Sequence, residues 1–206
     1  MRRCSFIAFF GGACLLLAVA MPGNIGIARC EVVVERLSVP QSFEFNGENY
    51  RLSWSSHPRP HYYKQEYLPA GQTSERFQRM ILIEATVREV SVKDMVAAQV
   101  SMLNKRKSSD PTVNFAVFKN PKNEEIILDF ILSAQDSKGE DMVEWSAYRY
   151  AALRSKGGAS GVLLFGVSRR AYGNDATNFL LRLKSARSAE IKALATHPLP
   201  VVRPMD

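Results

Sequence analysis

Cysteine and histidine are scarce in this 206-residue chain, which has three of each. The cysteines, Cys4, Cys14 and Cys30, all lie within the first thirty residues. The rest of the chain therefore has no thiol with which to form a disulfide, and a disulfide-stapled scaffold is excluded. Its core must be stabilised by burial of apolar side chains. An N-x-[ST] glycosylation sequon is also missing, which fits a bacterial source.

Familiar catalytic and metal-binding motifs are missing too: the chain has no P-loop, HExxH or CxxC sequence, and no GxGxxG after a first strand. His57 and His61 have the spacing of a helical metal pair, but Pro58 and Pro60 exclude a helix. In an extended chain they would lie about 13 Å apart. We expect an exposed Pro/His loop here. Ser160 lacks the second glycine and the following helix of a nucleophile elbow. We predict no catalytic residue, no metal and no cofactor; a hydrolase with an unrecognised site is the alternative.

The first 28 residues have the pattern of a secretory signal peptide. A positive start at Met1–Arg3 precedes apolar and small residues over 6–21, a stretch too short and too glycine-broken for a transmembrane helix. Gly26 and Ala28 favour cleavage after Ala28, and an A-x-A match ending at Ala20 is a second possible site. An uncleaved N-terminal anchor is the alternative. We predict export to the periplasm of a Gram-negative bacterium.

The net charge of +7 is mild, and cleavage would lower it by two through loss of Arg2 and Arg3. The basic residues are scattered apart from the run over 105–107 and the C-terminal helix. A nucleic-acid-binding protein would show a denser basic stripe with interleaved aromatic residues. We therefore expect a protein partner or an envelope component, no nucleic acid, and at most peripheral membrane contact.

The chain after the signal peptide is expected to form one domain over residues 29–197, followed by a loose tail over 198–206. Asn46 and Gly47 predict a two-residue hairpin turn, because both turn positions need positive φ. Ser91 is the predicted N-cap of a helix that ends before Pro111. Asn174 and Asp175 are expected to begin a second helix over 176–195, with an apolar face of Phe179, Leu180, Leu183, Ile191 and Leu194. His197 is expected to be solvent-exposed at its end. Strands are predicted over 32–37, 42–54, 62–68, 77–87, 113–119, 124–134, 142–153 and 161–171.

This order of elements predicts an α+β fold with an antiparallel sheet flanked by helices. It resembles the α/β/α sandwich of the photosystem PsbP subunit and of bacterial DcrB-type periplasmic proteins. The chain is also similar to small exported proteobacterial proteins that carry an aromatic-YxxEY-x-PxG-x₃-E segment, here Tyr63–Glu75. The resemblance implies a PsbP-like sandwich. For the second group it implies a link to secretion or conjugation systems, so an accessory component of such a system is an alternative function.

Aromatic residues give the candidate binding surface. Tyrosine combines an apolar ring with a polar hydroxyl and suits both cores and recognition surfaces. We predict a partner-binding surface without catalysis, and core packing of the same residues is the alternative. The candidate residues are Tyr62, Tyr63, Tyr67, Tyr148, Arg149 and Tyr150. The stretch over 61–81 is the predicted binding edge, because several tyrosines and charged groups converge there.

Overall fold

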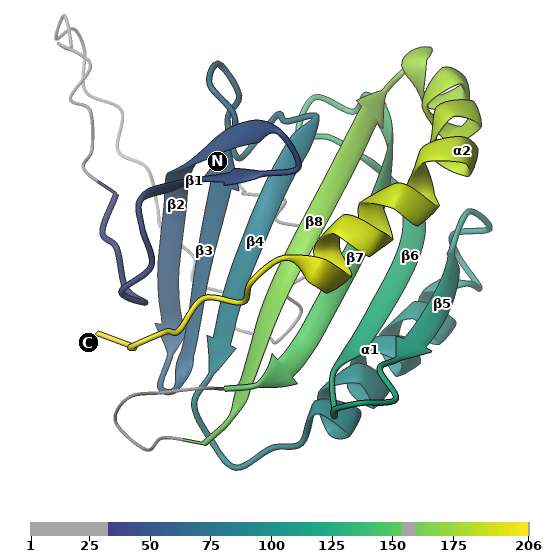
Figure 1. Ribbon diagram of the computed structural model, residues 1–206. Coiled ribbons are helices and arrows are strands. Elements are labelled where there is room, and N and C mark those ends of the chain that lie inside the picture. The colour runs from purple at the N-terminus through teal and green to yellow at the C-terminus, as the bar shows by residue number, and fades with distance from the viewer. Residues whose placement is uncertain (1–32, 154–159, 206) are drawn as a thin grey trace, which may run out of the picture.

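Eight strands pair in the order β1-β2-β3-β4-β8-β7-β6-β5, and every neighbouring pair is antiparallel. Two four-stranded meanders thus meet where β4 pairs with β8 (Figure 1). The computed structural model describes residues 33–153 and 160–205, and the α+β class is confirmed. The strands are β1 (Ser42–Phe45), β2 (Glu48–Arg59), β3 (Tyr62–Leu68), β4 (Arg79–Thr86), β5 (Asn114–Lys119), β6 (Ile126–Gln135), β7 (Asp141–Ala152) and β8 (Val162–Tyr172); the helices are α1 (Val92–Arg106) and α2 (Asp175–Thr196).

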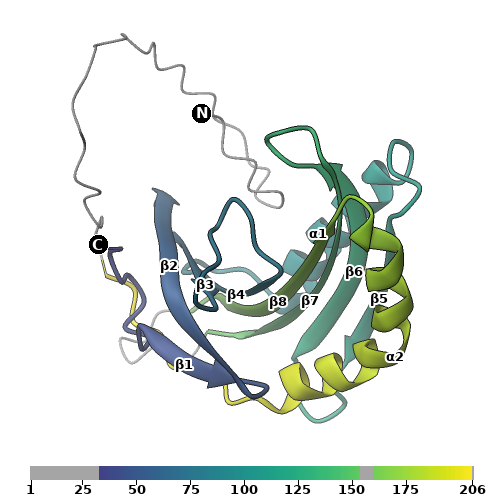
Figure 2. The same ribbon diagram turned by 90° about the horizontal axis from the view of Figure 1, so that it is seen from above.

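The sheet is curved, with one helix on each face (Figure 2). α1 lies on the face that we call concave, where its Val92, Val96 and Leu103 pack on β6, β7 and β8. α2 and the C-terminal segment over 197–205 lie on the opposite, convex face. A separate apolar cluster fills the space on each side, so the strands between them are buried on both faces.

Local sequence explains the main elements. Asn46 and Gly47 adopt φ values of 51° and 78° in the turn between β1 and β2, so the predicted hairpin is confirmed. The side chain of Ser91 accepts a hydrogen bond from the Asp94 backbone N–H at 3.0 Å, and the predicted N-cap of α1 is confirmed. In α2 the Asn174 side chain makes no capping bond, and Leu180 is exposed rather than part of the packed face.

The strand predicted over 32–37 is wrong for its described residues, which form no strand. The carboxylate of Glu35 accepts hydrogen bonds from the backbone N–H groups of Leu37, Ser38 and Val39 at 2.7–3.1 Å. This local side-chain bonding replaces ladder pairing, as carboxylates do in turns. Leu37 and Val39 are nevertheless buried in the convex-face cluster.

The C-terminal segment is not the loose tail that the sequence suggested. Val202 is completely buried, and the backbone N–H groups of Arg203 and Met205 donate to the carbonyls of Leu37 and Arg36. His197, expected in solvent, is partly buried and stacks on Phe165 with ring centroids 5.1 Å apart. The two ends of the described chain therefore pack together on the convex face.

The Pro/His loop expected after Trp54 is also corrected, because β2 continues to Arg59. A register shift between Ser56 and Arg59 absorbs the proline, as bulges do in edge-proximal strands. The His57 ring contacts the Tyr62 carbonyl at 3.0 Å and stacks on the Tyr63 ring, so it packs within the β2–β3 pair.

The predicted signal peptide over 1–28 lies outside the described residues. Within 33–153 and 160–205, neither helix is long and apolar enough to cross a membrane.

Candidate functional site

The six predicted binding residues are divided between the two faces of the sheet. Successive residues of a strand point to opposite faces, so neighbours such as Tyr62 and Tyr63 cannot share one surface. None of the six is more than 9% exposed, so they do not form one exposed patch. Whether any of them contacts a partner stays a prediction. Tyr62, Tyr148 and Tyr150 lie on the concave face, and Tyr63, Tyr67 and Arg149 lie on the convex face.

The two convex-face tyrosines pack and hydrogen-bond within the protein. Tyr63 stacks on His57 with ring centroids 4.1 Å apart, and the Tyr67 hydroxyl accepts a hydrogen bond from the Gln65 amide at 2.6 Å. Gln65 in turn accepts from the Arg36 backbone N–H, which fastens the N-terminal segment to β3. These contacts give the two tyrosines a structural role.

Arg149 ties the end of α2 to the sheet. Its Nη1 donates to the carbonyls of Leu194 and His197 at 3.0 and 2.7 Å, while Nε and Nη2 donate to Glu125 Oε2 at 3.0 and 2.8 Å. The last carbonyls of a helix have no partner within the helix, so a buried guanidinium there acts as a C-terminal cap. Glu125 supplies the balancing negative charge.

A charged cluster lies among the concave-face tyrosines. Lys64 and Glu66 are alternate residues of β3, and Lys64 pairs across the sheet with Glu84 of β4. The Lys64 ammonium is 3.1 Å from Glu66 Oε1 and 5.7 Å from the centre of the Trp54 ring. We call this group, which also contains the three concave-face tyrosines, the concave cluster; its members are Trp54, Tyr62, Lys64, Glu66, Glu84, Tyr148 and Tyr150.

The electrostatics of the concave cluster favour neutral hydroxyls and a protonated carboxyl. Burial raises the pKa of Glu84, an effect only partly offset by Lys64 and by a hydrogen bond with Tyr62. Burial also raises the pKa of Tyr62, Tyr148 and Tyr150, so each keeps its proton at neutral pH. The cluster therefore presents hydroxyl donors, the ammonium of Lys64 and the carboxyl groups of Glu66 and Glu84.

A second polar layer continues along the concave face toward the start of β7 and the end of β8. The hydroxyls of Ser146 and Ser168 are 2.7 Å apart, and Ser146 also donates to Glu144, which receives Arg170 Nε at 2.6 Å. Between the two layers, Gly166 leaves room for a tyrosine ring: a Cβ at this position would lie 2.6 Å from Tyr148 Cδ1.

No described helix lies over β2 and β3 on the concave face, since α1 packs on β6, β7 and β8 (Figure 2). The charged members of the concave cluster were missed by the sequence analysis. Alternation along β3 places Tyr62, Lys64 and Glu66 on one face, and this signal could have found two of them. Glu84 interrupts an otherwise apolar strand, which is a second signal. In the described residues, no three metal-ligating side chains come together.

Comparison with protein families gives one match, over residues 37–199. The chain belongs to this family. The match covers the region from just before β1 to just after α2 and fits a small bacterial protein. No curated protein and no solved structure matches the chain, so the resemblance to PsbP and DcrB proteins stays a prediction.

Proposed function

We propose that this chain is an exported periplasmic protein that binds a protein partner or an envelope component without catalysing a reaction, and that the concave cluster is its binding site. The observation that carries the proposal is the charged group of Lys64, Glu66 and Glu84 on the part of the sheet that no described helix covers. The N-terminal sequence supports export. A helix on each sheet face supports a PsbP-like sandwich.

Stability alone does not account for the concave cluster. Removing charges from water costs several kcal/mol per ion, and well-packed apolar side chains often serve a fold equally well or better. On the convex face of the same strand, β4 carries Ile81, Ile83 and Ala85. Glu84 lies between Ile83 and Ala85 in sequence but points to the concave face, where burial disfavours its charged form. Perturbed titratable groups of this kind concentrate at functional sites.

Two measurements test this proposal. When the full chain is expressed in a Gram-negative bacterium, the mature protein should be recovered from the periplasm with its N-terminus at residue 29. A cytoplasmic protein with residues 1–28 intact would contradict export.

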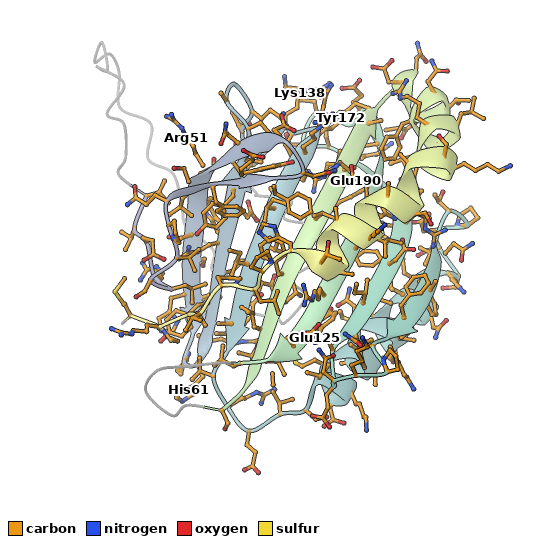
Figure 3. The ribbon with its side chains drawn as sticks, viewed as in Figure 1. Arg51, His61, Glu125, Lys138, Tyr172 and Glu190 are labelled. Carbon is orange, nitrogen blue, oxygen red and sulfur yellow. The ribbon has the colours of Figure 1, made fainter. Side chains whose placement is uncertain are left out.

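Binding is tested by crosslinking in whole cells. Glu84→Gln and Tyr62→Phe remove a titratable group and a hydroxyl while keeping the shapes of their side chains. Both variants should weaken the crosslinked species several-fold, whereas Arg51→Met, at an exposed arginine labelled in Figure 3, should leave it unchanged. Crosslinking that is equal in all three variants would exclude the concave cluster as the contact.

Hydrolysis is the second candidate function, and the pair of Glu66 and Glu84 favours it. Burial raises the pKa of Glu84, and a buried carboxyl group with a raised pKa can serve as a general acid. Lys64 would then stabilise negative charge in the transition state. A screen of ester, amide and glycoside substrates tests this. A hydrolytic activity abolished by Glu84→Gln would replace the binding proposal, and no turnover by the wild-type protein would remove this candidate.

A further inference from the structure

A pocket of about 590 Å³ lies between α2 and the convex face of the sheet, away from the concave cluster. Its walls come from α2, from β7 and β8, and from the connection between β3 and β4. Figure 3 labels Tyr172 and Glu190, which both line it. Small-molecule sites in proteins have volumes of roughly 300–1,000 Å³ and combine apolar walls with a few placed polar groups.

The apolar part of the pocket is formed by the inward side of α2 and by the sheet below it. Phe179 and Leu183 pack toward the convex-face cluster yet are only partly buried, and Trp145, which is 1% exposed, lies in the sheet beneath them at the base of the pocket. Leu194, near the other end of the helix, is the one residue of α2 that is fully buried. Protein interiors are close-packed with few voids larger than a water molecule, so a hollow of this size below the apolar side of a helix needs an explanation.

Two ion pairs and the hydrogen bonds of Arg149 hold α2 on the sheet around this hollow. Arg169 on β8 donates to Glu190 at 2.9 Å, and Arg187 pairs with the buried Asp129, which also accepts the indole N–H of Trp145. Farther along, Arg149 binds the last carbonyls of the helix.

Guanidinium groups form the polar part of the pocket. Its lining contains five arginines and three acidic residues. Of the acidic residues, Glu190 is bound by Arg169 and Glu140 by Arg76 at 2.8 Å, and Asp175 begins α2. Two arginines of the lining have N–H donors to offer a ligand. Arg79 uses one nitrogen for Glu48, and Arg182 makes no ion pair within the described residues. A guanidinium matches the geometry of a carboxylate with two parallel hydrogen bonds.

We propose that this pocket binds a small amphipathic carboxylate. Its hydrocarbon chain would lie between Trp145 and the α2 residues Phe179 and Leu183, and its carboxylate would bind Arg79 and Arg182. Arg79 is suited to this role because more than half of its side chain is exposed and its pair with Glu48 is a surface pair of small energy. The site does not depend on the concave cluster, so it stands apart from the proposed function.

Calorimetric titration of the full chain with sodium decanoate tests the proposal, with decan-1-ol as the uncharged comparison and acetate as the anion without a chain. Decanoate should bind at one site, at least tenfold more tightly than decanol, and acetate should not bind. The double variant Arg79→Met/Arg182→Met should weaken decanoate binding about 10- to 100-fold, the factor expected for charge-assisted hydrogen bonds. Arg51→Met should bind as the wild type does.

The position of the ligand is read from the indole N–H signal of Trp145 in a nitrogen-correlated NMR spectrum, which decanoate should shift in the wild type. An otherwise unchanged spectrum of the double variant shows that it folds. No decanoate binding to the wild type, equal affinity for decanol, or an equal loss in Arg51→Met would each overturn the proposal. A shift of the Trp54 signal in place of Trp145 would overturn it as well.

Discussion

Arg149 offers the clearest test of how α2 is held on the sheet. The sequence marked it as a binding residue, but the structure places its guanidinium between Glu125 and the carbonyls of Leu194 and His197. Replacing it by methionine keeps much of the side chain's length and removes all four hydrogen bonds. Glu125 then loses its cation, and two helix-end carbonyls lose their donor.

The expected cost follows from burial. Removing one partner of a buried, hydrogen-bonded ion pair costs about 3–5 kcal/mol. The Glu125 side chain is 16% exposed, so water reaches it and relieves part of the penalty. We therefore expect Arg149→Met to lower the free energy of unfolding by about 3 kcal/mol, at the lower end of that range. For a domain of this size, that loss corresponds to a fall in Tm of about 6–12 °C.

Thermal and urea unfolding followed by circular dichroism measure this loss, and hydrogen exchange locates it. Backbone amides from 190 to 205 should exchange faster in Arg149→Met, while those of β6 and β7 keep most of their protection. Arg51→Met is the matched control at an exposed site and should change the free energy of unfolding by less than about 0.5 kcal/mol. A loss below about 1 kcal/mol in Arg149→Met, with exchange unchanged over 190–205, would refute the role of Arg149 as the tether of α2.

Three further substitutions test the packing and the electrostatics. Because burial raises the pKa of Glu84, the native state holds the proton of this carboxyl more tightly than the unfolded state does, and wild-type stability is lost as pH rises. Glu84→Gln should therefore be more stable than the wild type by on the order of 1 kcal/mol at pH 8 and should gain little at pH 4. Equal urea midpoints of the two proteins at pH 8 would contradict this. Gly166→Ala places a Cβ against the Tyr148 ring and should cost about 1–3 kcal/mol in urea unfolding, so an unchanged midpoint would show that the ring does not approach this closely. Burial and the neighbouring Arg149 lower the pKa of His197 below its usual 6.5, so wild-type stability should fall as pH drops through and below that value. His197→Phe can keep the ring stacking and should lose less stability than the wild type between pH 7.5 and 5. Parallel losses in both proteins would argue against a neutral imidazole at this partly buried position.

Local patterns in the sequence predicted most of the fold. The Asn46-Gly47 turn, the Ser91 cap and the alternation along β3 each act over a few residues, so they can be read without knowing the rest of the chain. The errors arose where distant segments decide the outcome. Residues 33–37 have β-rich composition but lie beside the C-terminal segment, and β2 continues through Pro58 because β3 pairs with it. Tertiary pairing overrides local propensity in both places.

The candidate sites depend even more on long-range pairing. Alternation could place Tyr62, Lys64 and Glu66 together, but Glu84 joins them only through the register of β3 against β4. The role of Arg149 depends on carbonyls 45 and 48 residues farther along the chain. The sequence offers no local signal for either contact. A binding role of the tyrosines stays a prediction, and composition could not divide them between the two faces.

The charges of the concave cluster differ in their contacts from those that hold α2 on the convex face, and this contrast is the strongest support for the proposed site. On the convex face, Asp129, Arg149 and Arg169 each bind a group on α2, so the charges hold a helix in place. On the concave face, Lys64 and Glu84 meet each other and their strand neighbours, and no described helix is fastened by them. Buried charge that fastens one element to another has a structural explanation. Buried charge that does not, on the part of the concave face that no described helix covers, supports the proposal that a molecule binds there.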